Sequence, residues 1–315
     1  MKPTILLCYP VTSDDLQRAQ AEFPQYDWRV ASRDSITSEI AVAEIVFGKP
    51  SDEALAAATN MKWLQATSAG VESLAASPVF QRARFTLTTA SGMHESCAQH
   101  AIALLLGFTR RVSQHARLQD KLHWKSRKEV TTPDVLKGTL GIVGFGTIGR
   151  RVAQIARVLG MKIIGVSYRG LPDPNADEIV SIAQLDSVLP RCDALVLILP
   201  ATRETDNLLN AERLAKLPKH CIVVNVGRGN AIDEAALLAA LKEKRIAGAA
   251  LDVFAKEPLP DDSPLYYAPN LIMTPHIGGN RPDYDACAFE VFLENLRRYS
   301  RGEALKNIVE RERGY

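Results

Sequence analysis

The sequence predicts an α/β protein with two parallel sheets, each covered by helices. Short apolar runs rich in β-branched residues alternate with helical patterns along most of the chain, as is typical of strands with both faces covered. The chain has 315 residues, and at about 150 residues per domain this length favours two domains. A glycine-rich turn at residues 144–149 follows one of the strands directly and opens a helix, which is typical of a parallel α/β sheet.

The first hundred residues predict a small parallel sheet with helices between its strands. After it, the segment from Glu95 to Val112 is apolar at helical spacing and on most other positions, which predicts a helix buried on several sides. The stretch from His115 to Asp134 is charged and weakly patterned, so we expect a surface connection there. The expected strands are Ile5–Cys8, Ile45–Gly48, Trp63–Ala66 and Phe85–Thr89, and the expected helices are Asp14–Ala21 and Asp52–Thr59.

A second series of strands and helices begins at Gly138 with stronger signals. Its helices include Glu234–Lys242, and a last helix is expected over about Tyr284–Tyr299, with an apolar side that contains Phe289 and Phe292. The buried strands are expected at Leu140–Val143, Met161–Val166, Ala194–Leu199, Cys221–Val226, Ala247–Val253 and Leu271–Thr274.

Composition excludes several classes of function. The 38 Lys and Arg residues nearly balance the 36 Asp and Glu residues, and the net charge of +2 argues against a nucleic-acid or membrane-surface partner. The apolar N-terminal run is too short for a signal peptide, and runs such as Ala101–Phe108 fall below the ~18 residues that span a bilayer. The five cysteines form no CxxC pair, and His94, Cys97 and His100 do not share one helix face. We therefore expect a cytoplasmic protein with reduced thiols and no metal site.

The turn Gly144-Phe145-Gly146-Thr147-Ile148-Gly149 predicts a dinucleotide site. Gly144 allows the tight turn, Gly146 lets the backbone approach a pyrophosphate, and Gly149 lets the helix pack close to the strand. The helix N-terminus offers free N–H groups and a positive dipole end to the phosphates. The alternative is a purely structural glycine turn.

The end of the next strand predicts which dinucleotide is preferred. An NAD site usually has an acidic residue about twenty residues after the glycine turn, where it accepts from the ribose 2′-OH. Here Ser167 stands at that position and Arg169 follows it, and both can bind a 2′-phosphate that a carboxylate would repel. We expect a preference for NADP(H), with NAD(H) possible if Arg169 is only a solvated loop residue.

Three later motifs each follow a predicted strand. The first contains Arg228, the second Glu257 and the third His276. Ligands of open parallel sheets bind beyond the carboxyl ends of the strands, so these side chains are expected to converge. The set suits hydride transfer to a 2-keto acid: the arginine fork binds a carboxylate, the histidine supplies a proton to the ketone oxygen, and the glutamate stabilises the imidazolium. Taken singly, each residue is more often an ion-pair or structural residue.

Motifs in a fixed order run through most of the chain. They are Ala66-Thr67-Ser68-Ala69-Gly70-Val71-Glu72, the glycine turn, Leu199-Pro200 to Thr205, Asn225–Gly229, Leu251–Phe254 with Glu257-Pro258-Leu259, and Pro275-His276-Ile277-Gly278-Gly279. With these motifs the sequence resembles the D-isomer-specific 2-hydroxyacid dehydrogenase family, and the Ser167–Arg169 strand end resembles its NADPH-linked glyoxylate/hydroxypyruvate reductase branch.

The resemblance implies a role for each site residue. Arg228 would bind and polarise the substrate, His276 would be the general acid/base with Glu257 as its partner, and Asp252 would hold the nicotinamide carboxamide. The substrate carboxylate would be bound from the opposite domain by the backbone around Ser68, Ala69, Gly70 and Val71. The expected cofactor-binding residues are Gly144, Gly146, Thr147, Ile148, Gly149, Ser167, Arg169, Leu199, Pro200, Thr205, Val226, Gly227, Asp252 and Gly278.

The resemblance also implies the architecture: a Rossmann dinucleotide-binding domain, residues 96–282, inserted into a flavodoxin-like substrate-binding domain, residues 1–95 and 283–315. Relatives in the family are typically homodimers that pair through their nucleotide domains. One departure is Gln99, before His100, where many relatives carry an acidic residue. We expect this position to be structural.

The residues leave three hypotheses for the function of the protein. The leading one is NADPH-linked reduction of a small 2-keto acid, glyoxylate or hydroxypyruvate in class, to a D-2-hydroxy acid. The second is an NAD-linked D-lactate or D-phosphoglycerate type of dehydrogenase. The third is a dinucleotide-sensing scaffold like the corepressor branch of the family, which the intact set of Arg228, Glu257 and His276 disfavours.

Overall fold

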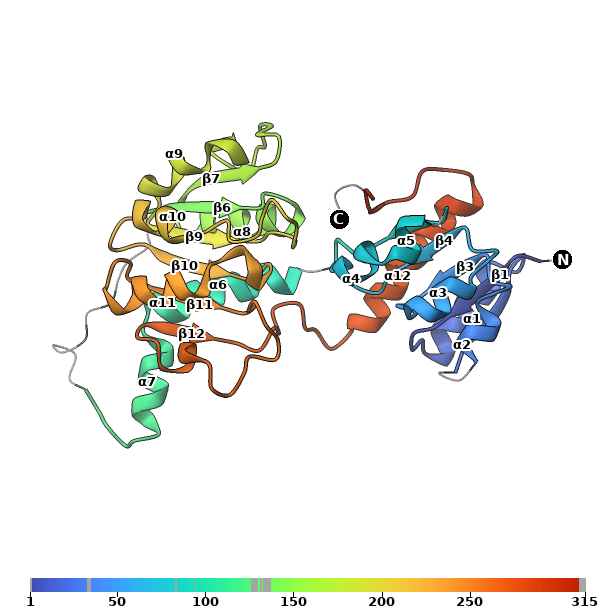
Figure 1. The fold of residues 1–315 in the computed structure, drawn as a ribbon, viewed down its shortest axis with the longest axis horizontal. Coiled ribbons are helices and arrows are strands. Elements are labelled where there is room, and N and C mark those ends of the chain that lie inside the picture. The colour runs from blue at the N-terminus through green and yellow to red at the C-terminus, as the bar shows by residue number, and fades with distance from the viewer. Residues whose placement is uncertain are drawn as a thin grey trace. The chain divides into compact units, whose positions relative to one another are not determined.

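The computed structural model describes residues 2–32, 35–82, 84–93, 95–125, 130, 132 and 137–311. The chain divides into two compact units, Met1–Met93 with Arg281–Tyr315, and His94–Asn280. Each unit contains one sheet, all of whose strand pairs are parallel, with helices around it (Figure 1). The predicted fold class, two doubly wound parallel α/β sheets, is therefore confirmed.

The sheet of the first unit has the strand order β2-β1-β3-β4-β5, the flavodoxin-like order. Alternate residues of each strand face opposite helix layers. Ile5 and Leu7 of β1 pack with α1 and α12, whereas Leu6 packs with α2 to α5. The elements are β1 Thr4–Leu7, α1 Ser13–Glu22, β2 Asp27–Val30, α2 Ile36–Glu39, β3 Ile45–Phe47, α3 Asp52–Ala57, β4 Trp63–Gln65, α4 Glu72–Ala76, α5 Pro78–Arg82, β5 Thr86–Thr88 and α12 Tyr284–Ser300.

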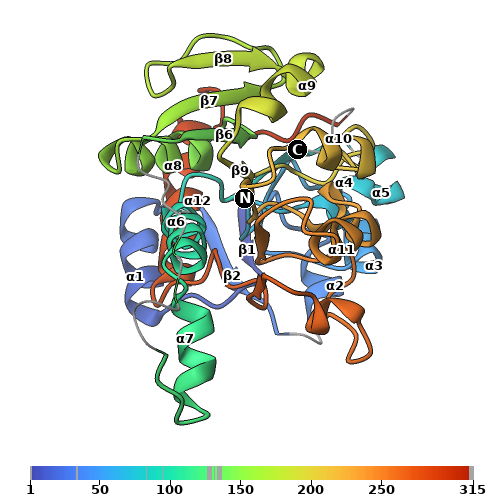
Figure 2. The ribbon, with the colours of Figure 1, turned by 90° about the vertical axis from the view of Figure 1, so that its left-hand side faces the viewer.

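The sheet of the second unit has the order β12-β11-β10-β9-β6-β7-β8 (Figures 1 and 2). When the strands are numbered from β6, the first strand of the unit, this is the Rossmann strand order. The order in which the chain adds strands reverses between β6 and β9, although all the strands are parallel. Helices α6 and α8 cover one face, and α9, α10 and α11 cover the other. The elements are α6 Glu95–Thr109, α7 Val112–Gln119, β6 Thr139–Val143, α8 Thr147–Val158, β7 Lys162–Ser167, β8 Glu178–Ser181, α9 Leu185–Val188, β9 Ala194–Leu197, α10 Ala211–Lys216, β10 Ile222–Asn225, α11 Glu234–Lys242, β11 Gly248–Leu251 and β12 Leu271–Met273.

The long helix predicted from Glu95 to Val112 is shorter than expected. It ends at Thr109, because the chain turns at Arg111, whose φ of 58° is left-handed. The expected surface connection after it was partly wrong, since its first residues form the helix α7, which has no buried residue and projects from its unit (Figures 1 and 2).

Candidate active site

The predicted site residues of the second unit follow the carboxyl ends of its parallel strands. Because all strands of this sheet run the same way, the loops that follow them lie at one edge. The glycine turn follows β6, Ser167 ends β7, and Leu199 follows β9. Of the remaining residues, Val226, Gly227 and Arg228 follow β10, Asp252 and Glu257 follow β11, and His276 and Gly278 follow β12.

The glycine turn leaves room for a ligand at its second glycine. A Cβ on Gly144, whose φ is +100°, would lie 2.2 Å from the Ile198 carbonyl oxygen, and one on Gly149 would lie 2.5 Å from the Gly144 carbonyl oxygen. These two glycines are therefore required by packing. A Cβ on Gly146 would meet no atom of the described chain within 4 Å, so the protein itself does not require this glycine.

The start of α8 supports the same conclusion. Helices α3, α10 and α11 each begin with a side chain that accepts from a backbone N–H of the first turn. Helix α8 begins at Gly146, which offers no such cap. The N–H groups of Thr147 and Ile148 are thus available to an anion, and with the open space at Gly146 they fit the diphosphate of a dinucleotide.

Two predicted cofactor residues lie at the end of β7. The Ser167 hydroxyl accepts from the backbone N–H of Gly170 at 3.1 Å, which closes the turn around Arg169. The Arg169 side chain is exposed, and the described part of the chain gives it no hydrogen bond or ion pair. This strand end therefore presents a cation and no carboxylate.

The loop after β9 uses its polar groups internally. The Thr205 hydroxyl donates to the Pro200 carbonyl at 2.7 Å and accepts from the Thr202 N–H at 2.9 Å. A Cβ on Gly227 would lie 2.5 Å from the Leu199 nitrogen, so the loops after β9 and β10 are in backbone contact. Thr205 thus shapes this loop.

His276 and Glu257 form a direct pair. The two side chains meet at 2.6 Å between Nδ1 and Oε2, and the other glutamate oxygen accepts from the Phe254 N–H at 2.9 Å. A carboxylate only accepts, so Nδ1 carries the hydrogen of this bond. The His276 side chain is 47 % exposed, and its Nε2 is the atom left to give or take a proton.

The loop that carries His276 is held by Asp252, which is 1 % exposed. Its Oδ1 accepts from the Ile277 N–H at 3.0 Å and its Oδ2 from the Gly278 N–H at 2.8 Å. Its backbone carbonyl accepts from the His276 N–H at 2.8 Å. Its carboxylate also accepts the Thr274 hydroxyl at 2.6 Å. Asp252 therefore stabilises the loop by accepting its hydrogen bonds. Its contact with the nicotinamide stays a prediction.

The loop that carries Arg228 is held by Asn225, which is 1 % exposed. Asn225 donates through Nδ2 to the Arg228 carbonyl at 2.9 Å and accepts from the Gly227 N–H at 3.1 Å. The guanidinium donates to the Gly227 carbonyl at 2.8 Å. The sequence placed Asn225 in a motif, but did not identify it as the residue that supports Arg228.

Cys97 of α6 lies close to these loops. Burial, and after it the negative charge of Asp252, raise the pKa of the Cys97 thiol to about 11, while Arg228 acts in the opposite direction. Near neutral pH the group is therefore a thiol, which is a poor nucleophile.

The predicted carboxylate loop, Ser68–Val71, lies in the first unit after β4. The Ser68 hydroxyl and the Lys49 ammonium both donate to the Gly70 carbonyl, at 2.7 Å and 3.2 Å. Within the described residues, the N–H groups of Ala69, Gly70 and Val71 find no acceptor. Consecutive free N–H groups of this kind suit an anion.

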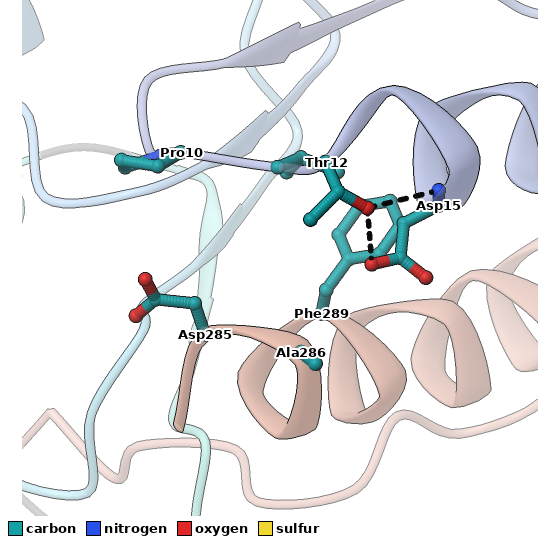
Figure 3. Close-up of a pocket in the computed structure, with 7 residues that line it drawn as sticks. Pro10, Thr12, Asp15, Asp285, Ala286 and Phe289 are labelled. Atoms are coloured by element: carbon teal, nitrogen blue, oxygen red, sulfur yellow. Dashed lines mark hydrogen bonds between the residues drawn. The ribbon is translucent and has the colours of Figure 1, made fainter. Parts of the chain in front are cut away.

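The first unit also contains a pocket of about 170 Å³ at the start of α1 and α12 (Figure 3). Asp15 is bonded to the Thr12 hydroxyl at 2.7 Å, and Asp285 accepts from the Tyr9 hydroxyl, also at 2.7 Å. Burial, followed by this bond, raises the pKa of Tyr9. Two carboxylates line the pocket and no cation does, so it does not suit an anionic substrate. The lining residues are Pro10, Val11, Thr12, Asp15, Asp285, Ala286 and Phe289.

The described residues contain no group of three or more His, Cys, Asp or Glu side chains that is placed to hold a metal. His94, which we considered with Cys97 and His100, lies outside them. Where the structure describes the chain, it has no helix with the length and apolar character to span a membrane.

The fold and the glycine turn define a dinucleotide-binding α/β protein. Residues 102–278 match the model of the D-isomer specific 2-hydroxyacid dehydrogenase NAD binding domain. The chain belongs to the D-isomer specific 2-hydroxyacid dehydrogenase family, as its motifs predicted. It is accordingly an oxidoreductase that uses a nicotinamide dinucleotide.

Similar proteins come from several bacteria. Glyoxylate/hydroxypyruvate reductase B of Pectobacterium carotovorum is 33 % identical over 98 % of each chain. A D-isomer specific 2-hydroxyacid dehydrogenase from Xanthobacter autotrophicus, solved in complex with NADPH and MES, is 29 % identical over all of both chains, with a TM-score of 0.85. The NADPH-dependent glyoxylate/hydroxypyruvate reductase of Sinorhizobium meliloti, solved with NADP and sulfate, is 25 % identical over the same span, with a TM-score of 0.85.

Proposed function

We propose that the protein reduces a small 2-keto acid, of the glyoxylate or hydroxypyruvate class, to a D-2-hydroxy acid with NADPH. The observation that carries the proposal is the hydrogen-bonded pair of His276 and Glu257. These residues follow the carboxyl ends of β12 and β11, on the same side of the sheet as the glycine turn after β6. The names of the reductases to which the chain is similar support the substrate class.

The protein's own contribution to the reaction is proton transfer and charge stabilisation. The bound cofactor supplies the hydride. Glu257 keeps the hydrogen on Nδ1 of His276, so that Nε2 of the imidazolium donates a proton to the ketone oxygen as negative charge develops there. Glu257 stabilises the imidazolium, and its second oxygen is held by the Phe254 N–H, which fixes the direction of the pair.

The substrate carboxylate requires positive charge and N–H donors. Arg228 provides a planar fork that binds carboxylates through two parallel bonds and polarises the keto group. The N–H groups of Ala69, Gly70 and Val71 provide further donors. On this proposal, residues 1–95 with 283–315 are the substrate-binding domain and residues 96–282 are the dinucleotide-binding domain.

Initial rates test the proposal. Glyoxylate, hydroxypyruvate, pyruvate and phenylpyruvate are each assayed with NADPH and with NADH. Rapid NADPH oxidation with glyoxylate or hydroxypyruvate would support it. NADH-linked turnover of pyruvate would favour the D-lactate type instead. Cofactor binding by fluorescence without turnover of any of the four acids would favour the sensing scaffold.

The preference for NADPH rests on Arg169. Arg169→Ala is expected to raise the KM for NADPH about ten- to a hundredfold, because a charge-assisted bond to the 2′-phosphate contributes about 1.5–3 kcal/mol. The KM for NADH should change little. Arg157→Ala is the matched control, since Arg157 is an exposed arginine of the same unit that pairs with Asp177 at 3.0 Å. A wild-type enzyme with a higher kcat/KM for NADH would contradict the assignment.

We also propose a homodimer. The surface that supports it lies on α7 and the residues after it, where Val112, Leu122 and Trp124 are 60 %, 95 % and 94 % exposed. An interface with a second copy would remove these apolar side chains from water. Light scattering after size exclusion should give twice the chain mass of 34.5 kDa. Trp124→Ser should weaken the dimer, and a wild-type monomer at micromolar concentration would refute this proposal.

A further inference from the structure

His100, on the long helix α6, contacts the loop that carries the proposed acid/base. Its Nε2 lies 2.9 Å from Oγ1 of Thr274 and 3.2 Å from Oδ1 of Asp252. Gln99, the residue before it, is exposed. The contact to the loop is therefore made by His100 and not by its neighbour.

The hydrogen bonds define the direction of this contact. The Thr274 hydroxyl uses its hydrogen on the Asp252 carboxylate, so it can only accept from His100. A carboxylate also only accepts. The Nε2 atom of His100 therefore carries a hydrogen and donates it to the pair formed by Thr274 and Asp252.

Packing adds to the hydrogen bonds. A Cβ built on Gly278 would lie 3.2 Å from Cδ2 of His100 and 2.8 Å from Oδ2 of Asp252. The ring therefore lies against the backbone of the loop as well as against its supporting carboxylate. His100 is 19 % exposed and Asp252 is 1 % exposed, so water competes little for these bonds.

The loop needs this support because its backbone is strained. His276 has a φ of 53°, a left-handed conformation that is uncommon and costs free energy for a residue other than glycine. Three hydrogen bonds hold the loop in this conformation: the N–H groups of His276, Ile277 and Gly278 all donate to Asp252. His100 and Thr274 in turn hold the carboxylate of Asp252.

We propose that His100 is a positioning residue: through Thr274 and Asp252 it holds residues 274–278, and so fixes the direction of the His276 side chain. This inference rests on the proposed function for its kinetic consequence. Its structural consequence, a loop that opens more easily without His100, is independent of that function.

The test uses His100→Leu, His100→Gln, Thr274→Val and the double variant His100→Leu/Thr274→Val. Leucine removes the donor, whereas glutamine can place an amide donor near the position of Nε2. The control is His220→Leu, because Nε2 of His220 pairs with Asp193 at 2.7 Å. Asp193 immediately precedes β9, so this second His–Asp pair of the same unit lies at the opposite edge of the sheet.

Amide hydrogen exchange gives the first readout. In His100→Leu, peptides that cover residues 274–280 should exchange about tenfold faster, since the N–H groups of Ile277 and Gly278 are released when the loop opens. Exchange of these peptides should stay close to wild type in His100→Gln and in His220→Leu. Unchanged exchange in His100→Leu, or equal acceleration in all three variants, would overturn the proposal.

Kinetics give the second readout. His100→Leu should lower kcat about ten- to a hundredfold, in line with the effect of a small displacement of a catalytic group. The NADPH dissociation constant and the substrate KM should change less than about threefold. His100→Gln should recover most of kcat, and the double variant should be about as slow as His100→Leu alone, because both changes break one network.

The outcomes separate the two proposals. A wild-type enzyme that turns over none of the four keto acids would refute the proposed function, and the exchange measurement would still decide the role of His100. Normal kcat in a folded His100→Leu enzyme, or glutamine as damaging as leucine, would show that His100 serves stability alone.

Discussion

His276→Ala is expected to lower kcat by about a hundred- to ten-thousandfold, the range typical of general acid–base catalysis. The alanine removes the only ring nitrogen that the geometry leaves available for proton transfer, since Nδ1 is bonded to Glu257 at 2.6 Å. The charge that develops on the ketone oxygen is then met by no proton donor. Steady-state rates with glyoxylate or hydroxypyruvate and saturating NADPH measure the effect.

Two companion measurements make the result specific. NADPH affinity by fluorescence titration should stay within about threefold of wild type, because the glycine turn and the strand end at Ser167 are untouched. Glu257→Gln should also lower kcat, by less than His276→Ala, because the histidine remains while the charge that stabilises its imidazolium is lost. His220→Ala is the control histidine. Near-normal turnover of His276→Ala would refute the assignment of the acid/base.

The interior strands of each sheet could be predicted from the sequence, and so could the edge strands β5 and β12, but the edge strands β2 and β8 could not. Interior strands such as β9 and β10 are fully buried, so their residues form continuous apolar runs. β2 and β8 lie at sheet edges, are mostly half-buried or exposed, and carry no such run. We did not predict either strand. The helix at Glu234–Lys242 has the predicted bounds, because an aspartate cap and a lysine end mark them.

Some features of the candidate site could be predicted from the sequence, and others could not. The turn at Gly144–Gly149 and the strand-end positions of Arg228, Glu257 and His276 could be predicted, because glycine geometry and parallel strands act locally or through one shared edge. The contact between His100 and Thr274 joins residues that are 174 positions apart. It depends on how α6 lies on the sheet, which no spacing in the sequence encodes.

Arg228→Lys is expected to raise the substrate KM and to lower kcat, each by about tenfold or more. Lysine keeps the positive charge but cannot form the two parallel bonds with which guanidinium binds a carboxylate, and a charge-assisted bond contributes about 1.5–3 kcal/mol. The position is also prepared for arginine: one Nη atom donates to the Gly227 carbonyl at 2.8 Å, which orients the planar group. Rates measured over a range of substrate concentrations separate the two constants.

Arg245→Lys is the matched control for this variant. The Arg245 guanidinium also donates to backbone carbonyls, those of Leu217 and Ala215, but Arg245 precedes β11 and therefore lies at the sheet edge away from the catalytic loops. Its replacement should lower thermal stability and leave KM and kcat unchanged, because it loses the same kind of bond without touching substrate. If Arg228→Lys also lowers thermal stability but leaves KM and kcat unchanged, the Arg228 guanidinium only stabilises its own loop. The substrate carboxylate is then bound by other residues.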